Sequence, residues 1–203
     1  MAQNYRKEME QLMASAPEGE HLLLHSCCGP CSSAVLEQLS SHFKVLLLYY
    51  NPNIWPRQEY DRRRDEQIQV LKMLPVRFAV RFEELPYCPE EFLRAVRGLE
   101  DAPEGGVRCE ACFSLRLARA AQEAAVRGIS WFTTTLTVSP HKNADVLNRL
   151  GRETEQKYGV RFLASDFKKK EGYKRSLELS AEYGLYRQDY CGCEFGRKQR
   201  FEE

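Results

Sequence analysis

Cysteine clusters are the part of this sequence best suited to chemistry. Seven of the eight cysteines in the 203-residue chain fall into three short clusters, Cys27-Cys28-Gly-Pro-Cys31, Cys109-Glu-Ala-Cys112 and Cys191-Gly-Cys193. Cysteine thiolates bind metal ions and iron–sulfur clusters, and they also carry out redox reactions. Cys88 stands apart from the clusters, and we expect no role for it in the chemistry.

Four thiolates from two remote segments could bind one tetrahedral metal ion or one iron–sulfur cluster. Cys109 and Cys112 are three residues apart at the start of a predicted helix, so both thiols share one face. The start of a helix is also expected to lower their pKa. Cys28 and Cys31 supply the second knuckle that a structural zinc site needs. Adjacent cysteines at 27 and 28 are unusual for a zinc knuckle, and no ferredoxin-type run is present, so the spacing leaves both metals open.

The third cluster has a different spacing. Two thiols separated by one glycine, Cys191 and Cys193, can form a strained, easily reduced disulfide or chelate one metal ion. They could also be an incidental pair in the tail. The spacing does not choose among these interpretations.

Short apolar runs alternate with helical patterns along the chain. Strands are predicted at residues 21–25, 44–50, 76–80, 129–136 and 160–164. Helices are predicted at residues 32–41, 58–74, 89–97, 109–127, 143–158 and 173–183, with Ser32 or Ser33 capping the first. The pattern predicts an α/β fold in three layers, with a mostly parallel five-stranded sheet and helices on both faces. Residues 185–195 show no clear period.

Unusual segments follow three of the predicted strands. Residues 27–31, 137–142 and 166–170 come directly after the first, fourth and fifth strands. Ligands of parallel sheets bind beyond the carboxyl ends of the strands. The sequence therefore predicts one active site at this edge.

Composition limits the remaining possibilities. Hydrophobic residues make up 43% of the chain and the net charge is +1, which excludes a disordered protein and does not favour a globally basic one. No apolar run approaches the ~18 residues of a membrane span, and the N-terminus lacks a secretory signal. We expect a single cytoplasmic domain spanning residues 1–203, with a core at about 20–195, a short N-terminal helix and a Cys-Gly-Cys tail.

Six motifs together resemble one known family. They are LHSCCGPCSS (24–33), YYNPNIWPRQEYDRR (49–63), RCEACFSLRL (108–117), FTTTLTVSPHKN (132–143), DFKKKEGYKRSLELS (166–180) and LYRQDYCGC (185–193). In this order, from about residue 22 to 193, they resemble the cobalamin-independent epoxyqueuosine reductases, the QueH family. The resemblance implies a Rossmann-like fold related to the adenine nucleotide α-hydrolases.

The same resemblance implies a [4Fe-4S] cluster with Cys27, Cys28, Cys109 and Cys112 as ligands. Cys191 and Cys193 would be the redox-active, catalytic pair, or would hold a further iron ion. The family varies at the position of Cys31, so the role of that residue stays open.

The implied reaction is the last step of queuosine synthesis on tRNA. The epoxide of epoxyqueuosine, at the wobble position, is reduced to an alkene with two electrons and two protons, and water is lost. An electron donor that the sequence does not identify must supply the electrons. Asp166, Tyr190 and His141 are candidate proton donors by position alone.

A polyanionic RNA substrate predicts basic and aromatic residues beside the site. The candidate cations are Arg62–Arg64, Lys142, Lys168–Lys170 and Lys174-Arg175. The candidate stacking residues are Tyr49, Tyr50, Trp55 and Tyr190. A charge run is also typical of a solvated helix face, and strand tyrosines are also typical of packing.

Two other functions compete with the reductase. A tRNA thiolase of the ATP-pyrophosphatase type would need a glycine- and serine-rich phosphate loop after the first strand. Here that turn holds one glycine and a proline, which lacks an N–H donor. A zinc-stabilised tRNA-binding module without enzymatic activity is the second alternative.

Overall fold

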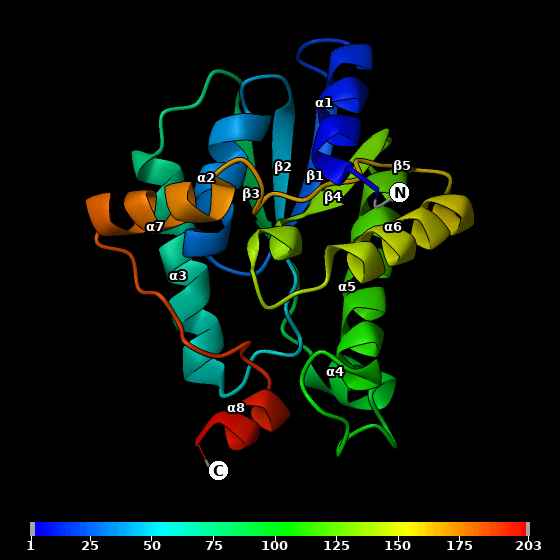
Figure 1. Cartoon of the computed structure of the whole chain (residues 1–203), viewed down its shortest axis with the longest axis vertical. Helices are drawn as coiled ribbons and strands as arrows, with labels where there is room; N and C mark the ends of the chain where they lie inside the picture. Colours follow the sequence, from blue (N-terminus) through cyan, green and yellow to red (C-terminus); the bar gives the residue numbers. More distant parts are fainter. Residues whose placement is uncertain (1–2, 202–203) are drawn as a thin grey trace.

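A five-stranded, entirely parallel sheet forms the centre of the computed structural model, which describes residues 3–201 (Figure 1). The strand order is β3-β2-β1-β4-β5. The strands are β1 (His21–Ser26), β2 (Lys44–Tyr49), β3 (Val80–Glu84), β4 (Trp131–Thr134) and β5 (Arg161–Phe162). The predicted three-layer α/β class is confirmed, and the arrangement is consistent with a Rossmann-like fold.

Helices cover both faces of this sheet. On one face lie α5 (Val107–Val126) and α6 (Ala144–Tyr158). On the other lie α2 (Gly29–Leu39), α3 (Arg57–Met73) and α7 (Gly172–Glu182). The N-terminal helix α1 (Tyr5–Ser15) contributes a buried side chain to each of the two cores.

Alternating side chains of the central strands explain the two cores. In β1, Leu23 packs under α5 and α6, whereas Leu22 and Leu24 pack under α2 and α3. All three are fully buried. Successive strand residues point to opposite faces, so a strand covered on both sides must be a continuous apolar run.

Helix α2 begins earlier than the sequence predicts. It starts at Gly29, with Pro30 in its first turn, and the predicted capping role of Ser32 and Ser33 is wrong. Their hydroxyls donate instead to the carbonyls of Gly29 and Pro30, one turn back in the same helix. Proline is favoured in the first turn because its missing N–H is not needed there. The earlier start brings Cys31 into the helix.

The sheet edges also differ from the prediction. The third strand is Val80–Glu84 rather than residues 76–80. It is an edge strand that pairs only with β2, and its charged side chains are typical of an edge. The fourth strand stops at Thr134 and passes into a 3-10 turn, η1 (Thr135–Val138), and the fifth is only two residues long.

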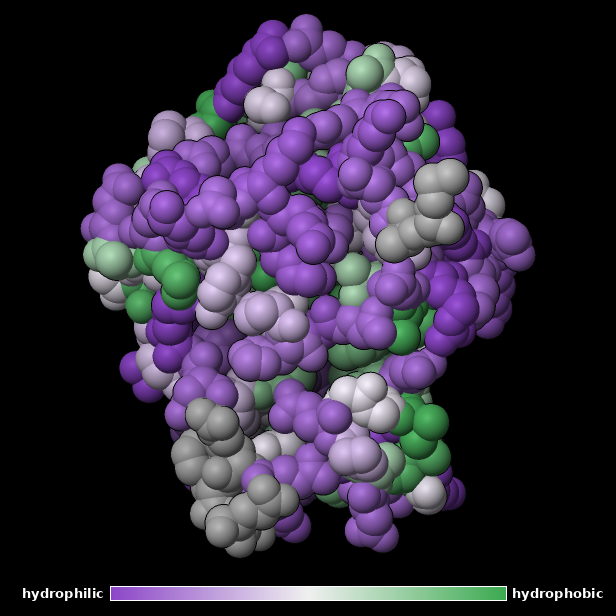
Figure 2. All heavy atoms as spheres, viewed as in Figure 1, coloured by the Kyte–Doolittle hydropathy of each residue, from purple (hydrophilic) through white to green (hydrophobic). Residues whose placement is uncertain are grey.

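Two short helices lie beyond the carboxyl ends of the strands. They are α4 (Pro89–Ala95) and α8 (Glu194–Phe201), and no pattern in the sequence predicts α8. The segment from α7 to α8 runs down past α3 in Figure 1 and ends below the sheet. The face in Figure 2 is mainly hydrophilic. Across the described residues, no helix combines the length and the apolar character needed to cross a membrane.

Candidate metal centre

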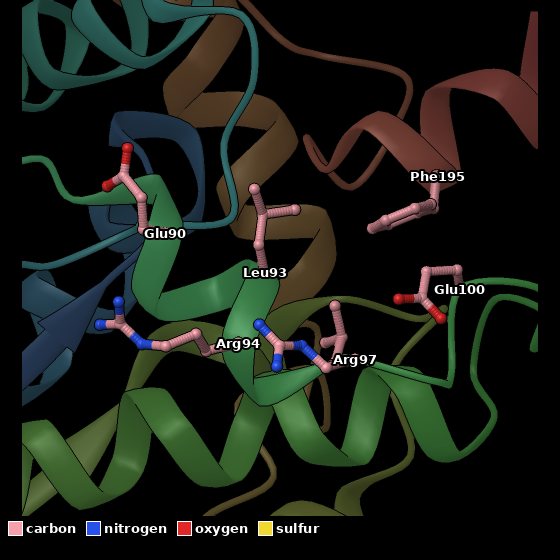
Figure 3. Close-up of a pocket in the computed structure, with 7 residues that line it drawn as sticks. Glu90, Leu93, Arg94, Arg97, Glu100 and Phe195 are labelled. Carbon is pink, nitrogen blue, oxygen red and sulfur yellow. The ribbon is translucent and has the colours of Figure 1, made fainter.

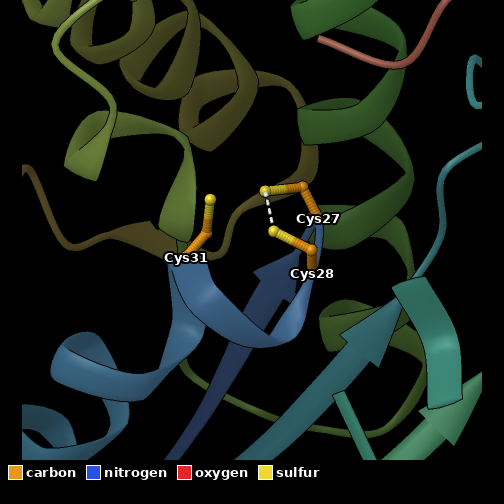
Figure 4. Close-up of side chains that lie close together, drawn as sticks. All are labelled: Cys27, Cys28 and Cys31. Carbon is orange, nitrogen blue, oxygen red and sulfur yellow. Dashed lines mark hydrogen bonds between the residues drawn. The ribbon is translucent and has the colours of Figure 1, made fainter. Parts of the chain in front are cut away.

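Three thiols gather at the carboxyl end of β1. The sulfur atoms of Cys27, Cys28 and Cys31 all lie within 4.8 Å of one another, and those of Cys27 and Cys28 are 3.8 Å apart (Figure 4). All three cysteines are free thiols. Three sulfur donors directed at a common space are a ligand set suited to a soft metal or to iron–sulfur chemistry.

The backbone of this turn depends on Gly29. A Cβ atom at Gly29 would lie 2.7 Å from the carbonyl oxygen of Glu66 on α3. The hydroxyl of Ser26 donates to the side chain of Gln67, also on α3, at 2.6 Å. Because α3 packs closely against this turn, it fixes the backbone from which the side chains of Cys27 and Cys28 project.

One of the three thiols is favoured as the thiolate. Hydrogen bonds from the Cys28 and Cys31 thiols lower the pKa of Cys27 well below its ordinary value. The positive charges of Lys142 and Arg116 act in the same direction. The hydrogen bond to Cys27 raises the pKa of Cys28 to about 12. The cluster therefore holds its first negative charge on Cys27.

The second cysteine pair lies at the start of α5. Cys109 and Cys112 are both buried, and the Cys109 sulfur accepts a hydrogen bond from the backbone N–H of Gly105 at 3.2 Å. Burial raises the pKa of both thiols, that of Cys112 to about 11. The predicted lowering by the helix N-terminus is thus wrong for the metal-free thiols, because desolvation outweighs it.

Arg116 connects the two pairs. It lies one turn after Cys112 on α5 and is buried, although sequence reasoning gave it no role. Burial alone would lower its pKa, but the neighbouring negative charges of Cys112, Cys27 and Cys191 raise it overall. One guanidinium therefore interacts electrostatically with cysteines from all three clusters.

Neutral groups hold Arg116 in place. Its Nη2 donates to Oδ1 of Asn51 at 2.6 Å, and its Nε donates to Nε2 of His25 at 3.2 Å. The same Nε2 lies 3.1 Å from the carbonyl oxygen of Tyr50, and Nδ1 of His25 lies 2.9 Å from the hydroxyl of Thr134. Burial and the Arg116 charge lower the pKa of His25 to about 3, which keeps the imidazole neutral.

The third cluster lies against α3. The Nη1 of Arg63 donates to the carbonyl of Cys191 at 3.0 Å, and its Nη2 donates to the carbonyl of Tyr190 at 3.3 Å. Arg63 is buried and paired with Glu59 at 2.6 Å, so it is not a solvated surface residue. It holds the tail in position.

The glycine between the tail cysteines has a structural reason. Gly192 has φ +111°, and a Cβ atom there would lie 2.7 Å from Nη1 of Arg63. The flanking thiols are both free. Cys193 is buried, accepts a hydrogen bond from the N–H of Gly196 at 3.2 Å, and has its pKa raised to about 12 by burial.

A direct contact joins the tail to the first cluster. The side-chain amide of Gln188 donates to the sulfur of Cys28 at 2.9 Å. Cys112 and Cys193 belong to one small apolar cluster with Phe92 and Val96. The structure thus brings all three cysteine clusters to the predicted edge, although Cys31, not Cys109 or Cys112, completes the tightest group of three sulfurs.

The predicted proton donors lie in different surroundings. His141 is exposed, and its backbone N–H bonds to Ser139. Asp166 is buried and paired with Lys168 at 2.8 Å. Tyr190 is half-buried, directly before Cys191, with the Arg63 guanidinium 5.1 Å from its ring centroid. Only Tyr190 belongs to the segment held beside the sulfur atoms.

Lys142, one of the cations predicted to contact RNA, interacts electrostatically with the thiols of the cysteine site. Burial alone would lower its pKa, but the charges of Cys191, Cys27 and Cys31 raise it to about 12. Its ammonium group therefore stays protonated beside the thiols. Lys142 follows η1 in the chain, at the edge of the sheet where the fourth strand ends.

Most of the other residues predicted to contact RNA are buried or already paired with other residues of the protein. Tyr49 and Tyr50 are buried in the core, so their predicted stacking role is wrong. The remaining basic residues of the predicted runs include several that pair with carboxylates, as in Lys170–Glu10 at 2.7 Å and Arg175–Glu37 at 2.7 Å. Trp55, by contrast, is 45% exposed.

Two surface depressions in the described part of the chain are not lined by the cysteines. One, of about 450 Å³, lies between α4 and α8 (Figure 3). It is lined by Glu90, Leu93, Arg94, Val96, Arg97, Glu100 and Phe195. Val96 and Phe195 also contact the apolar cluster around Cys112 and Cys193, so this depression backs onto the site. A second, of about 310 Å³, lies over α4 and α5.

Comparison with known proteins decides the family. The family model described as epoxyqueuosine reductase QueH matches residues 22–199, which include every cysteine of the three clusters. The chain belongs to this family. The QueH protein of Streptococcus pyogenes serotype M1 is 42% identical over 97% of this chain and 79% of its own length. That of Thermotoga maritima is 40% identical over 90% of this chain and 93% of its own.

Membership of the QueH family separates the competing functions. A QueH protein of Staphylococcus epidermidis is likewise 40% identical over 95% of this chain and 84% of its own length. These relatives are named as reductases, and none of the three names a thiolase or a binding module. The match therefore favours a redox role for the sulfur-rich edge.

Proposed function

We propose that this protein reduces epoxyqueuosine at the wobble position of tRNA to queuosine. The epoxide accepts two electrons and two protons, both C–O bonds break, an alkene forms and the oxygen leaves as water. The observation that supports this function is the convergence of buried thiols and buried cations at one sheet edge in a chain of the QueH family.

The donor set fits an iron–sulfur cluster. We assign its ligands as Cys27, Cys28, Cys109 and Cys112, with Cys31 beside them. The first two are the sulfur atoms 3.8 Å apart at the end of β1, and the other two share one face of α5. Arg116 borders both pairs and balances the negative charge of ligated thiolates. A bound cluster supplies low-potential electrons.

Cys191 and Cys193 are assigned to the reacting side of the site. Cys191 is half-buried and lies close enough to Cys109, Cys112 and Lys142 to interact with them electrostatically. Its backbone is fixed by Arg63, so its thiol approaches the substrate from a defined direction. The pair can act as thiols or hold a further iron ion that polarises the epoxide oxygen.

A positive charge lies at the edge of the sheet where the epoxide oxygen departs. The Lys142 ammonium lies among the thiols and stabilises negative charge as the C–O bond breaks. Tyr190 is assigned as the proton donor of the three predicted candidates because it precedes Cys191 in the same held segment. We further propose a cytoplasmic location, where tRNA is available and eight free thiols stay reduced.

Anaerobic reconstitution tests the proposal directly. The protein is loaded with iron and sulfide, supplied with a chemical reductant and incubated with tRNA that carries epoxyqueuosine. Mass analysis of the nucleosides should show that epoxyqueuosine loses one oxygen atom and becomes queuosine. Stoichiometric zinc without iron or acid-labile sulfide, together with unchanged epoxyqueuosine, would support the binding module instead. Micromolar ATP binding by calorimetry would support the thiolase.

A further inference from the structure

An exposed tryptophan lies at the edge that carries the sulfur atoms. Trp55 is in the loop that follows β2, and 45% of the residue is exposed. Its backbone N–H donates to the carbonyl of Gly192 at 2.8 Å. The backbone of Trp55 is therefore joined by one hydrogen bond to Gly192, the residue between Cys191 and Cys193.

A guanidinium accompanies this ring. Arg197 on α8 lies with its guanidinium carbon 5.6 Å from the ring centroid of Trp55. A second pair of the same kind lies at the start of the tail, where the guanidinium carbon of Arg62 is 3.2 Å from the ring centroid of Tyr186. Aromatic rings and arginine planes are the groups with which proteins stack unpaired nucleobases.

Other candidate RNA contacts are weaker on this structure. Lys168, Lys170 and Arg175 each form an ion pair with a carboxylate within 2.8 Å, so much of their charge is already balanced. Trp131, the other tryptophan, is buried and bonds to Glu20. Trp55 is the large aromatic surface that remains available beside the tail cysteines.

We propose that Trp55, together with Arg197, is a stacking platform for an unpaired RNA base adjacent to the base that enters the cysteine site. An enzyme that acts on a base must take it out of the stack, and the neighbouring base then loses a stacking partner. The indole replaces that partner and positions the RNA. This inference rests on the proposed function, because it requires an anticodon loop as substrate.

Binding can be measured without turnover. The probe is a short anticodon stem–loop RNA with unmodified guanine at the wobble position. Because Trp131 is buried, stacking should quench the fluorescence of Trp55 selectively. Trp55→Ala should weaken binding by roughly 5- to 150-fold, whereas Trp55→Phe, which retains an aromatic face, should lose the quenching and keep most of the affinity. Met73→Ala is the matched control, since Met73 is 39% exposed at the far end of α3.

RNA probes with one base removed identify the stacked position. An abasic nucleotide on one side of the wobble position should weaken binding to the parent protein as much as Trp55→Ala does. Combining that probe with Trp55→Ala should cost little more, as expected for two partners in one contact. Equal affinity of Trp55→Ala and parent for every probe overturns the platform, while turnover of epoxyqueuosine would still support the reductase. Failure of the parent to bind any loop overturns the platform and also contradicts an RNA substrate.

Discussion

The two cysteine segments joined by Gln188 are held in place by different means. Cys27 and Cys28 lie where the central strand β1 passes into α2, so sheet pairing on both sides and the first helical turn fix them. Cys191 and Cys193 lie in an irregular tail, which Arg63 and the backbone of Trp55 hold through hydrogen bonds to its carbonyls.

This difference separates two kinds of dependence on sequence. The position of the β1 thiols follows from the fold and can be lost only by disturbing it or by removing a sulfur atom. The position of the tail thiols depends on a few side chains that can be changed one at a time. We therefore expect variants of the tail to separate turnover from the capacity to hold iron.

Serine substitutions should give the largest contrast. Cys112→Ser removes a proposed ligand on α5, and reconstituted protein should lose its iron, its sulfide and its visible thiolate-to-iron absorbance. Cys193→Ser should retain that absorbance but lose turnover of epoxyqueuosine-tRNA. Iron and sulfide analysis, spectroscopy and nucleoside mass analysis check the pair.

The half-buried Cys88 provides the control for this contrast. Cys88→Ser should retain both absorbance and activity, because Cys88 lies before α4 and takes no part in the proposed site. A Cys193→Ser protein that works at the parent rate would show that the tail pair does not take part in the chemistry.

Gly192→Ala should disturb the tail alone. A Cβ atom there meets Nη1 of Arg63 at 2.7 Å, and the buried Arg63–Glu59 pair leaves the guanidinium little room to move. The positive φ adds about 1 kcal/mol of backbone strain. Turnover should fall at least about tenfold, as for other misplaced reacting groups, while the visible spectrum is kept.

Gly98→Ala is the control for Gly192→Ala, because it also places a side chain at a positive φ but without a steric clash. Gly98 also has a positive φ, +78°, but nothing lies within 4 Å of its Cβ position. Its activity should stay near that of the parent. Equal losses in the two variants would mean that strain in general, rather than the contact with Arg63, causes the effect.

Gln188→Leu should act on the electrons rather than on the fold. The Gln188 amide donates to the Cys28 sulfur at 2.9 Å, and hydrogen bonds to cluster sulfurs raise the reduction potential. Removing the donor should lower the midpoint potential of the reconstituted protein while iron content is unchanged. A redox titration followed by electron paramagnetic resonance measures the shift.

Gln188→Glu is a useful companion because it keeps the length of the side chain but places an acceptor beside the sulfur. Its midpoint potential should also fall below that of the parent. A midpoint potential equal to that of the parent would show that the bond does not persist beside a bound cluster.

Sequence patterns were sufficient for the parts of the fold that have two buried faces. The run KVLLLYY predicts β2 because a strand covered on both sides must be apolar throughout. The same rule failed at β3, an exposed edge strand with Arg81, Glu83 and Glu84, while the apolar Val76 is 42% exposed outside it. Edge strands carry little of the periodic signal on which the prediction depends.

Site residues divide in a similar way. The cysteines could be found from residue type and spacing, and the first cluster also from its place after a predicted strand. The positioning roles of Arg63 and Arg116 could not, because the partners that reveal them, Cys191 and Asn51, are distant in sequence and carry no local sign of the contact. The approach of Cys31 to Cys27 likewise depends on the exact start of α2, the least predictable feature of a helix.

The smallest effect is expected where the two regions are linked only at the surface. Glu37 on α2 pairs with Arg175 on α7, the helix that leads into the tail, at 2.7 Å. The hydrogen bond with Arg175 lowers the pKa of Glu37, so the pair stabilises the folded state above the unfolded-state pKa, near 4.5, and this contribution is lost as pH falls through the lowered value. Both side chains are about 40% exposed, and solvent screening limits the effect to about 0.5 kcal/mol or less. Glu37→Gln should therefore reduce the free energy of unfolding slightly at pH 7 and not at all in strong acid, as urea denaturation would show. Glu178→Gln, which removes a longer 3.5 Å contact to the same Arg175, should have a still smaller effect. A loss of several kcal/mol in Glu37→Gln would mean that this surface pair, and not the contacts of Arg63 and Trp55, holds the tail against the first cysteine cluster.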